Sequence, residues 1–269
     1  DDYIYVDKTQ FLYDIVSKDK YYFLSRPRRF GKTLFIDTLK TFFEGKKELF
    51  KGLYVYDKEW SWDEYPIVKL DFNEIEHHDP DILYQRVDEE IENIGQEHNI
   101  NLKRNTVPSK FNELVKKLSD KYDKGVVVLV DEYDKPIISH LSKDSIKIAR
   151  ANQDFLKRFY DNLKPLESYL KTVFITGVSK FSKVSIFSTL NNLIEIEKEP
   201  VFAEIMGYTE EELDQYFGQY FLKLAEKYKL TEEETKEKFR RTYNGFRFTE
   251  KDSKVYNPYS TGRALNYLR

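Results

Sequence analysis

The stretch RPRRFGKTLF, at residues 26–35, joins two segments whose patterns predict different elements. Before it, the aromatic and apolar run at residues 21–25 is typical of a short buried strand. After it, apolar side chains recur at helical spacing up to Gly45, at Leu34, Leu39, Phe42 and Phe43. A strand, a tight loop and a helix are therefore predicted in this order, and such a unit indicates an α/β fold.

The last part of the loop, Phe30-Gly31-Lys32-Thr33, matches the second half of the phosphate-loop pattern G-x-x-x-x-G-K-[ST]. In such loops backbone N–H groups and a helix N-terminus hold phosphate oxygens, the lysine bridges the outer phosphates and the hydroxyl ligates Mg²⁺. Lys32 and Thr33 are expected in these two roles. The pattern has glycine where this chain has Arg26, and Pro27 lacks an N–H, so the motif alone also fits a basic turn.

A second motif lies about a hundred residues downstream. The run VVVLVDE, at residues 126–132, is an apolar segment that ends in two carboxylates, as in a parallel strand covered on both faces. Asp131 is expected to hold Mg²⁺ through water, and Glu132 to orient the attacking water and take its proton. A buried strand that meets an acidic turn is the alternative. Both motifs together, in this order, favour binding of ATP and Mg²⁺.

The composition excludes several classes of protein. The chain has 269 residues, 40% of them hydrophobic, which is enough for one large α/β domain or a core with a small second domain. It has no cysteine, which excludes disulfides and thiolate chemistry and suits a cytoplasmic protein. The net charge of -3 argues against a strongly basic nucleic-acid coat protein. No apolar run has the length of a membrane span, so no membrane contact is expected.

Strand and helix patterns alternate up to about residue 205. Strands are expected at residues 67–71, 172–176 and 193–196, and helices at residues 81–94, from Pro108 onward, and at residues 146–163. The alternation predicts an α/β core over residues 1–205, with a mostly parallel sheet flanked by helices.

The pattern changes after Met206. Two capping boxes, Thr209 with Glu212 and Thr231 with Glu234, predict helix starts, and a hairpin is expected over residues 243–256. Residues 206–269 therefore read as a small, mainly helical subdomain. Asn257 and Pro258 resemble a further helix start, with no stop signal after it, and the chain begins without methionine. We expect the natural protein to continue beyond residue 269.

These residues also carry a family resemblance, because seven stretches match in order over nearly the whole chain. The chain resembles the bacterial and archaeal AAA-ATPase-like family of P-loop proteins, in which an arginine-rich loop is the normal form. The matching stretches are YVDKT (5–9), RPRRFGKTL (26–34), VDEYDKP (130–136), TGVSKFS (176–182), LNNL (190–193), YNGF (243–246) and YNPYS (256–260). The resemblance implies an ATPase core, often followed by a nuclease-like domain of the PD-(D/E)xK type, which would lie beyond residue 269.

P-loop ATPases of the additional-strand class place one strand between the loop strand and the Asp-Glu strand. The candidate for that strand is residues 172–176. A polar side chain at its end can sense the γ-phosphate or position the water, and Thr176 is the first choice for this catalytic role, with Ser179 second. A threonine satisfied by local backbone is the equal alternative.

The loop itself supplies the expected nucleotide contacts. The candidate cofactor-binding residues are Arg28, Arg29, Phe30, Gly31, Lys32, Thr33 and Leu34. One of Arg26, Arg28 and Arg29 is a candidate for stabilising transition-state charge, as an arginine finger does. The alternative is that they pair with carboxylates and shape the loop.

Other charged and aromatic residues carry weaker predictions. Lys180, Lys183 and Arg247 are further cationic candidates, Tyr5 to Lys8 are candidates for adenine contact, and Asp134 is expected to pair locally rather than join the metal shell. His77 and His78 lack a third metal ligand at suitable spacing, so a solvated turn is expected there.

Together these features predict Mg²⁺-dependent ATP hydrolysis that drives a conformational switch, read by a fused or partner nuclease-like domain and through it by nucleic acid. A non-hydrolysing ATP-bound scaffold or sensor, a small-molecule kinase, and a nucleic-acid-binding module that uses the loop arginines are the alternatives. The sequence is compatible with an oligomer and shows no preference between ATP and GTP.

Overall fold

The sheet at the centre of the molecule has five parallel strands in the order β2-β3-β4-β1-β5. The computed structural model describes residues 4–18, 20–179, 186–190, 192–250 and 252–266. The strands are β1 (Tyr21–Ser25), β2 (Ile67–Asp71), β3 (Val126–Asp131), β4 (Leu170–Gly177) and β5 (Ile194–Glu195). β4 lies between β1 and β3, as predicted for the additional-strand class.

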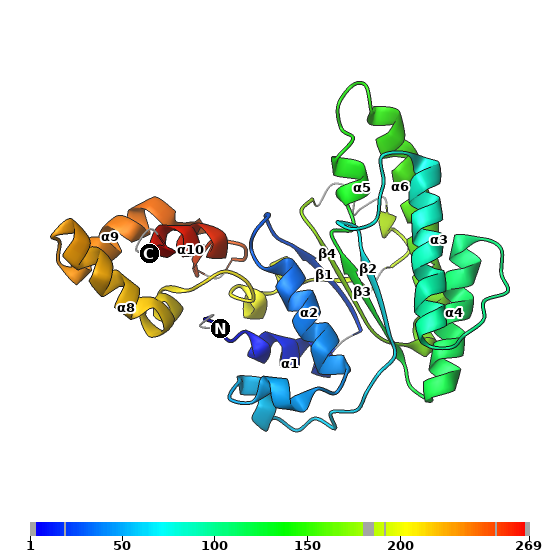
Figure 1. Cartoon of the computed structure of the whole chain (residues 1–269), viewed down its shortest axis with the longest axis horizontal. Coiled ribbons are helices and arrows are strands. Elements are labelled where there is room, and N and C mark those ends of the chain that lie inside the picture. The colour runs from blue at the N-terminus through cyan, green and yellow to red at the C-terminus, as the bar shows by residue number, and fades with distance from the viewer. Residues whose placement is uncertain (1–3, 19, 180–185, 191, 251, 267–269) are drawn as a thin grey trace.

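Helices cover both faces of this sheet (Figure 1). On one face lie α1 (Thr9–Lys18) and α2 (Lys32–Phe43), and on the other lie α3 (Pro80–Glu97), α4 (Val107–Tyr122) and α6 (Ile146–Tyr160), with the short α5 (Lys135–Ile138) at the strand ends. Every residue of β1 and β3 is buried, because each of these strands has a neighbour on both sides and helices above and below.

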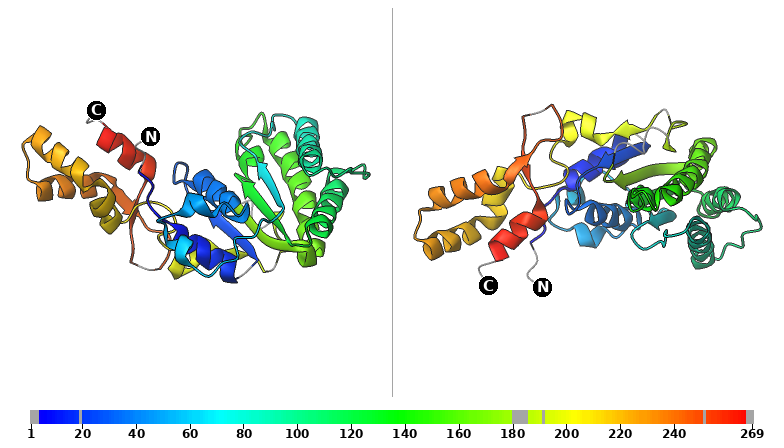
Figure 2. Two further views of the ribbon diagram at one scale, coloured as in Figure 1. Left: turned by 60° about the horizontal axis from the view of Figure 1, so that its bottom comes forward. Right: turned by 90° about the horizontal axis from the view of Figure 1, so that it is seen from above.

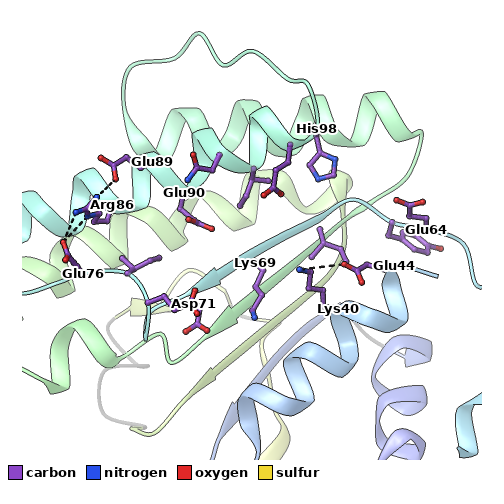
Figure 3. Close-up of a pocket in the computed structure, with 17 residues that line it drawn as sticks. Lys40, Glu44, Glu64, Lys69, Asp71, Glu76, Arg86, Glu89, Glu90 and His98 are labelled. Carbon is purple, nitrogen blue, oxygen red and sulfur yellow. Dashed lines mark hydrogen bonds and ion pairs between the residues drawn. The ribbon is translucent and has the colours of Figure 1, made fainter. Parts of the chain in front are cut away.

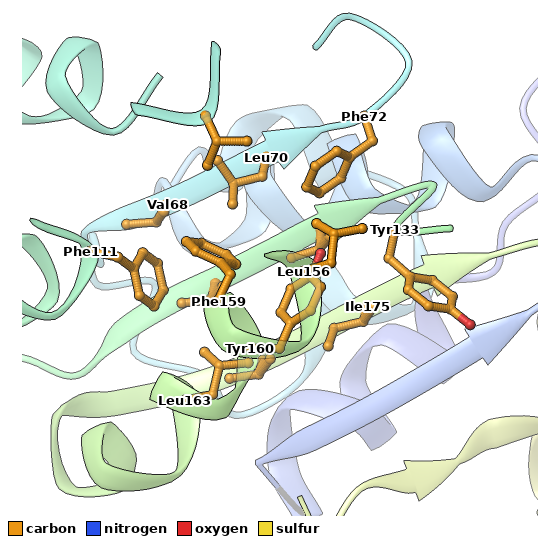
Figure 4. Close-up of a cluster of buried hydrophobic side chains, with 14 of the residues drawn as sticks. Val68, Leu70, Phe72, Phe111, Tyr133, Leu156, Phe159, Tyr160, Leu163 and Ile175 are labelled. Carbon is orange, nitrogen blue, oxygen red and sulfur yellow. The ribbon is translucent and has the colours of Figure 1, made fainter. Parts of the chain in front are cut away.

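Two apolar clusters fill the two sides of the sheet. On the side of α3, α4 and α6, side chains such as Leu70, Phe111 and Phe159 meet over β2 and β3 (Figure 4). On the side of α2, Leu39 and Phe42 pack in the second cluster, and their spacing in the sequence is that of one helix face. The apolar residues that predicted strands and helices therefore form two continuous cores, one on each face of the sheet.

Several element boundaries differ from the sequence patterns. The helix predicted over residues 146–163 ends at Tyr160, and Asp161–Tyr169 is a 3₁₀ helix that contains Pro165, whose ring is incompatible with an α-helix interior. The last strand covers only Ile194–Glu195 because the 3₁₀ helix Ile196–Lys198 follows at once. The patterns also missed α1 altogether.

The C-terminal elements gather beyond α1 and α2, away from the sheet (Figure 2). They are α8 (Glu210–Tyr228), α9 (Glu232–Tyr243), the antiparallel pair β6 (Asn244–Phe246) and β7 (Val255–Tyr256), and α10 (Pro258–Asn266). Both predicted capping boxes are present: Thr209 and Glu212 exchange bonds at the start of α8, and Thr231 and Glu234 at α9. Asn257 accepts a bond from the Ser260 amide through its side chain, as an N-cap does.

These helices have a third apolar cluster, to which Val6 is the one contributor from the N-terminal segment among the described residues. Lys8 ties that segment to α8, because its ammonium group donates to both carboxylate oxygens of Glu212 at 2.5 and 2.7 Å. The division into domains at residues 205 and 206 stays a prediction. In the described part of the chain, no helix combines the length and the apolar character needed to cross a membrane.

Candidate active site

Three chain segments meet at the carboxyl ends of the central strands. The loop at residues 26–31 follows β1, Asp131 ends β3 and Glu132 follows it, and Thr176 lies near the end of β4. Because β1, β4 and β3 are adjacent and parallel, their carboxyl ends lie side by side at one end of the sheet. Ligands of α/β proteins bind at this end. Residues about a hundred positions apart in the chain therefore form one site.

A chain of short hydrogen bonds joins these segments. Thr33 donates its hydroxyl proton to Asp131 Oδ2 at 2.6 Å, and Thr176 donates to Asp131 Oδ1 at 2.5 Å. The Thr176 oxygen also accepts the backbone N–H of Glu132 at 3.2 Å. Asp131 and Thr176 are fully buried, whereas Thr33 is exposed. Asp131 is thus held on both oxygens, by Thr33 on the exposed side of the site and by Thr176 in the interior.

Lys32 and Glu132 form an ion pair inside this site. The Lys32 Nζ lies 2.9 Å from Glu132 Oε1, and it donates to the carbonyl oxygens of Arg26 and Pro27 at 3.1 and 3.3 Å. Lys32 is 4% exposed and Glu132 8% exposed. The ammonium group is therefore folded back onto the loop, where two backbone carbonyls and one carboxylate hold it.

Two residues other than glycine adopt left-handed backbone angles here. Glu132 has φ 53° directly after β3, and Arg29 has φ 67° in the loop. Gly31, with φ 94°, precedes the first residue of α2. Such angles cost roughly 1–3 kcal/mol for residues with a Cβ, and they concentrate at functional sites. At Glu132 the angle turns the carboxylate back toward Lys32 while the amide reaches Thr176.

The three loop arginines differ in their surroundings. Arg26 is 1% exposed; its guanidinium donates to the Ser25 carbonyl at 3.0 Å and to the Phe202 carbonyl at 3.5 Å. Burial lowers the pKa of Arg26 to about 10, and nearby Glu197 opposes that shift. Arg26 is therefore enclosed by the protein and bonded to backbone carbonyls, and its role as a loop-shaping residue stays a prediction. Arg28 is exposed, and no described residue forms an ion pair with it.

Aromatic side chains of the C-terminal elements cover the loop, and sequence reasoning missed this. Phe30 packs edge-on against Phe246 and Phe248, with ring centroids 4.9 and 5.3 Å apart. The Arg26 guanidinium lies 4.1 Å from the centroid of Phe248, and that of Arg29 lies 3.9 Å from the centroid of Tyr259. The only signal in the sequence is the aromatic content of NGFRF and NPYS. Their partners are more than two hundred residues away.

The turn that follows β4 is held by hydrogen bonds to Asp134, which lies two residues after Glu132. Asp134 is buried, and its carboxylate accepts the N–H groups of Val178 (3.2 Å) and Ser179 (2.6 Å). Burial raises the pKa of Asp134, and these bonds oppose the shift. A Cβ at Gly177 would collide with the Tyr133 ring and lie 2.8 Å from Asp134 Oδ1, so only glycine fits. Asp134 therefore bonds to amides 44 and 45 positions along the chain, that of Ser179 among them, rather than pairing locally as expected.

A small cavity of about 100 Å³ adjoins the loop at the start of α2. Leu34, which is 58% exposed, lies at it together with Tyr5, Phe30 and Tyr208. Of the candidates for adenine contact, Tyr5, Val6 and Lys8 line this cavity, and Lys8 is engaged with Glu212. Contact with adenine stays a prediction.

The remaining candidates lie elsewhere. Lys180 and Lys183 fall outside the described residues. Arg247 donates to the carbonyls of Thr249 and Glu250 in its own turn. His77 is half-buried rather than solvated, since its Nδ1 lies 3.2 Å from His140 Nε2. Within the described residues no three metal-ligating side chains form a cluster.

The residues at the site fit a magnesium ion. Mg²⁺ prefers oxygen ligands, and proteins bind it through one or two of them together with water and substrate phosphates. The Thr33 hydroxyl and the Asp131 carboxylate supply two oxygens 2.6 Å apart at the exposed edge of the site. Their hydrogen bond marks the position that a hydrated cation between the loop and β3 would take.

The strand order, the loop between β1 and α2, and the carboxylates after β3 define an α/β protein with the P-loop NTPase fold. A family model described as "Predicted AAA-ATPase" matches residues 1–187, and the chain belongs to this AAA-ATPase-like family, whose name implies nucleotide binding. The chain is also 37% identical over 260 residues to an "Uncharacterized protein in vnfD 5'region" of Azotobacter chroococcum mcd 1. That match covers 96% of this chain and 48% of the relative, so the chain spans about half of the relative's length.

Proposed function

We propose that the protein binds ATP with Mg²⁺ and hydrolyses it to ADP and phosphate. The observation that carries the proposal is the convergence of Lys32, Thr33, Asp131, Glu132 and Thr176 at the carboxyl ends of β1, β3 and β4. Membership of a family of predicted AAA-ATPases supports the same conclusion.

The loop holds the phosphates through Lys32 and the amides that precede α2. Pro27 contributes no N–H, so the donors run from about Arg29 to the first turn of the helix. The ammonium group of Lys32 leaves the carbonyls of Arg26 and Pro27 for phosphate oxygens. The ion pair with Glu132 opens in the same movement, and this frees the carboxylate.

The chemical step belongs to Glu132. Its carboxylate accepts a proton from a water molecule while the water oxygen forms a bond to the γ-phosphorus and the bond to the ADP oxygen breaks. Thr176 holds the Glu132 amide and Asp131 in place, because its hydroxyl bonds to both. Thr33 and Asp131 would hold Mg²⁺, which neutralises phosphate charge when bound. Arg28, exposed on the loop, is the candidate for further charge stabilisation.

The adenine ring is assigned to the small cavity beside the loop. Tyr5 and Tyr208 line it from two separate segments, and Leu34 forms an exposed apolar edge. A flat purine ring, whose faces pack well on apolar and aromatic side chains, suits such a cleft, with the phosphates directed toward Gly31. No donor or acceptor specific for one purine is evident there.

Hydrolysis is proposed to act as a conformational switch. The contacts of Arg26, Arg29 and Phe30 with the β6–β7 hairpin and α10 mean that any movement of the loop displaces C-terminal elements. On the strength of the family resemblance, we propose that a nuclease-like domain, fused or separate, reads this movement and thereby acts on nucleic acid. The nucleic-acid-binding alternative is weakened by burial of Arg26 and stacking of Arg29.

A phosphate-release assay tests this function. Wild type, Lys32→Ala and Glu132→Gln are compared with and without Mg²⁺, and ATP binding is measured in the same samples. Lys40→Ala and Glu44→Gln are matched controls, because this second Lys–Glu pair lies at the C-terminal end of α2 with side chains 43% and 27% exposed. We expect Lys32→Ala to lose binding, and Glu132→Gln to bind ATP while turnover falls about 10²- to 10⁴-fold.

The other outcomes separate the alternatives. Binding without turnover in wild type identifies a scaffold or sensor, and phosphate transfer only with an added acceptor identifies a kinase. Salt-dependent DNA binding that survives Lys32→Ala identifies a nucleic-acid module. If no sample binds nucleotide, the loop is a basic turn and the proposal fails.

A further inference from the structure

The strand β2 forms one edge of the sheet, because β3 is its only neighbour among the described strands. The Val127 amide donates to the Pro66 carbonyl and the Phe72 amide to the Asp131 carbonyl. Alternate residues of a strand bond to the same neighbour, so Val68 and Leu70 face β3 with their backbone groups. The backbone N–H and C=O groups of Ile67 and Lys69 point away from β3, and no described residue forms a hydrogen bond with these groups.

A groove of about 700 Å³ lies along this edge. Figure 3 shows Lys69 and Asp71 of β2 between two walls. Glu90 of α3 and His98, the residue after α3, lie on one side, and Lys40 and Glu44 at the end of α2 lie on the other. Ile67, Ile75 and Ile94 add apolar surface to it. The unpaired backbone groups therefore lie in a groove with two walls rather than on a flat rim.

The groove is acidic. Eight carboxylates line it, from Glu44, Glu64, Asp71, Glu74, Glu76, Glu89, Glu90 and Glu97, against three cationic side chains, from Lys40, Lys69 and Arg86. Each of the cations is already paired: Lys40 with Glu44, Lys69 with Asp37, and Arg86 with Glu76 and Glu89. No described cation forms an ion pair with Glu64, Glu74, Glu90 or Glu97, so negative charge remains in excess.

Like charges act on one another inside the groove. Burial raises the pKa of Glu90, and the facing carboxylates of Glu97 and Glu74 raise it further. A cationic side chain placed between them would relieve this repulsion. A nucleic acid is excluded as an occupant by the same charge, and a second copy paired edge to edge would set acidic walls against each other.

We infer that the β2 groove binds an extended, basic segment of a partner protein, which adds to the sheet as a sixth strand. The segment's backbone would pair with Ile67 and Lys69, and its alternating side chains would reach the two acidic walls. Charged residues such as Lys69 also protect strand edges from aggregation. That protective role requires neither a groove nor an excess of one sign of charge.

The test uses a short capped peptide in which Lys and Arg alternate with Val and Thr. Two controls are the same peptide with its edge-facing amides N-methylated, and a peptide with Glu in place of Lys and Arg. Binding is measured by anisotropy, and amide hydrogen exchange is followed at Ile67 and Lys69. We expect only the unmethylated basic peptide to bind and to protect these two amides.

The variant Glu90→Gln/Glu97→Gln should weaken binding about tenfold. The control Glu226→Gln/Glu233→Gln, on exposed parts of α8 and α9, should leave it unchanged. Equal binding of the methylated peptide, binding without protection of the two amides, or no binding of the basic peptide would each overturn the inference. So would a dimer in solution that Lys69→Pro abolishes, because it would make a second copy the occupant.

Discussion

At the scale of single residues, we expect the free energy of unfolding to depend on the hydroxyl of Thr176 but not on that of Thr172, although both lie on β4. Both side chains are buried on β4, but Thr176 bonds to Asp131 and to the Glu132 amide, whereas Thr172 Oγ1 has no hydrogen-bond partner among the described residues. Thr176→Val should lower the free energy of unfolding by about 1–3 kcal/mol, since two buried partners lose their bond. Thr172→Val should be neutral or stabilising.

Urea unfolding measures both changes, and ATP turnover gives a second readout for the first. Turnover of Thr176→Val should fall while nucleotide binding persists, because Lys32 and the loop amides are untouched. If Thr172→Val and Thr176→Val lower the free energy of unfolding equally, the bond between Thr176 and Asp131 makes no specific contribution to stability.

At the scale of elements, the β6–β7 hairpin and the phosphate loop form one packed unit. Phe248 contacts both Phe30 and Arg26, so a loop rearranged by phosphate should alter the hairpin. We expect a non-hydrolysable ATP analogue to change amide hydrogen exchange over residues 244–250 and 252–256 in wild type. In Phe248→Ala this response should shrink, while the first turn of α2 still responds.

The matched control is Tyr228→Ala, an aromatic residue that is 59% exposed at the end of α8. It should leave the hairpin response intact. The coupling is disproved if the hairpin of wild type exchanges at the same rate with and without nucleotide while the loop is protected.

At the scale of the whole molecule, the N-terminal segment links the sheet to the C-terminal helices. Lys8 is 9% exposed and bonds to both oxygens of Glu212, whose side chain also caps α8. Lys8→Met leaves that carboxylate without its cation, and we expect a loss of about 1–3 kcal/mol in the free energy of unfolding. Lys236→Met, at exposed carboxylates of α8 and α9, should cost less than about 1 kcal/mol.

Two probes show whether the parts also separate. Both tryptophans, Trp60 and Trp62, lie before β2, so fluorescence reports the sheet, while far-ultraviolet circular dichroism reports all helices. The two unfolding curves should coincide in wild type and diverge in Lys8→Met, with dichroism falling first. Coincident curves in the variant would mean that other contacts hold the C-terminal helices.

Much of the fold and part of the candidate site were predictable because their signals are local. The apolar run of β3, the spacing of Leu39 and Phe42 in α2, and the capping box at Thr209 each depend on neighbours within a few residues. The prediction of β4 between β1 and β3 came from a class of proteins rather than from local spacing. The boundary at Tyr160 was missed because 3₁₀ and α patterns share side-chain spacing over one turn.

By itself, the sequence determined the order of most elements, the residue types at the strand ends, and the family, since periodicity and motif spacing are properties of the chain. Tertiary structure alone decided that Arg26 is buried and Arg28 is exposed, that Phe248 covers the loop, and that β2 is an edge beside an acidic groove. Each of these depends on contacts between segments far apart in the chain. Such contacts are set by how layers pack and by which strand is left without a neighbour.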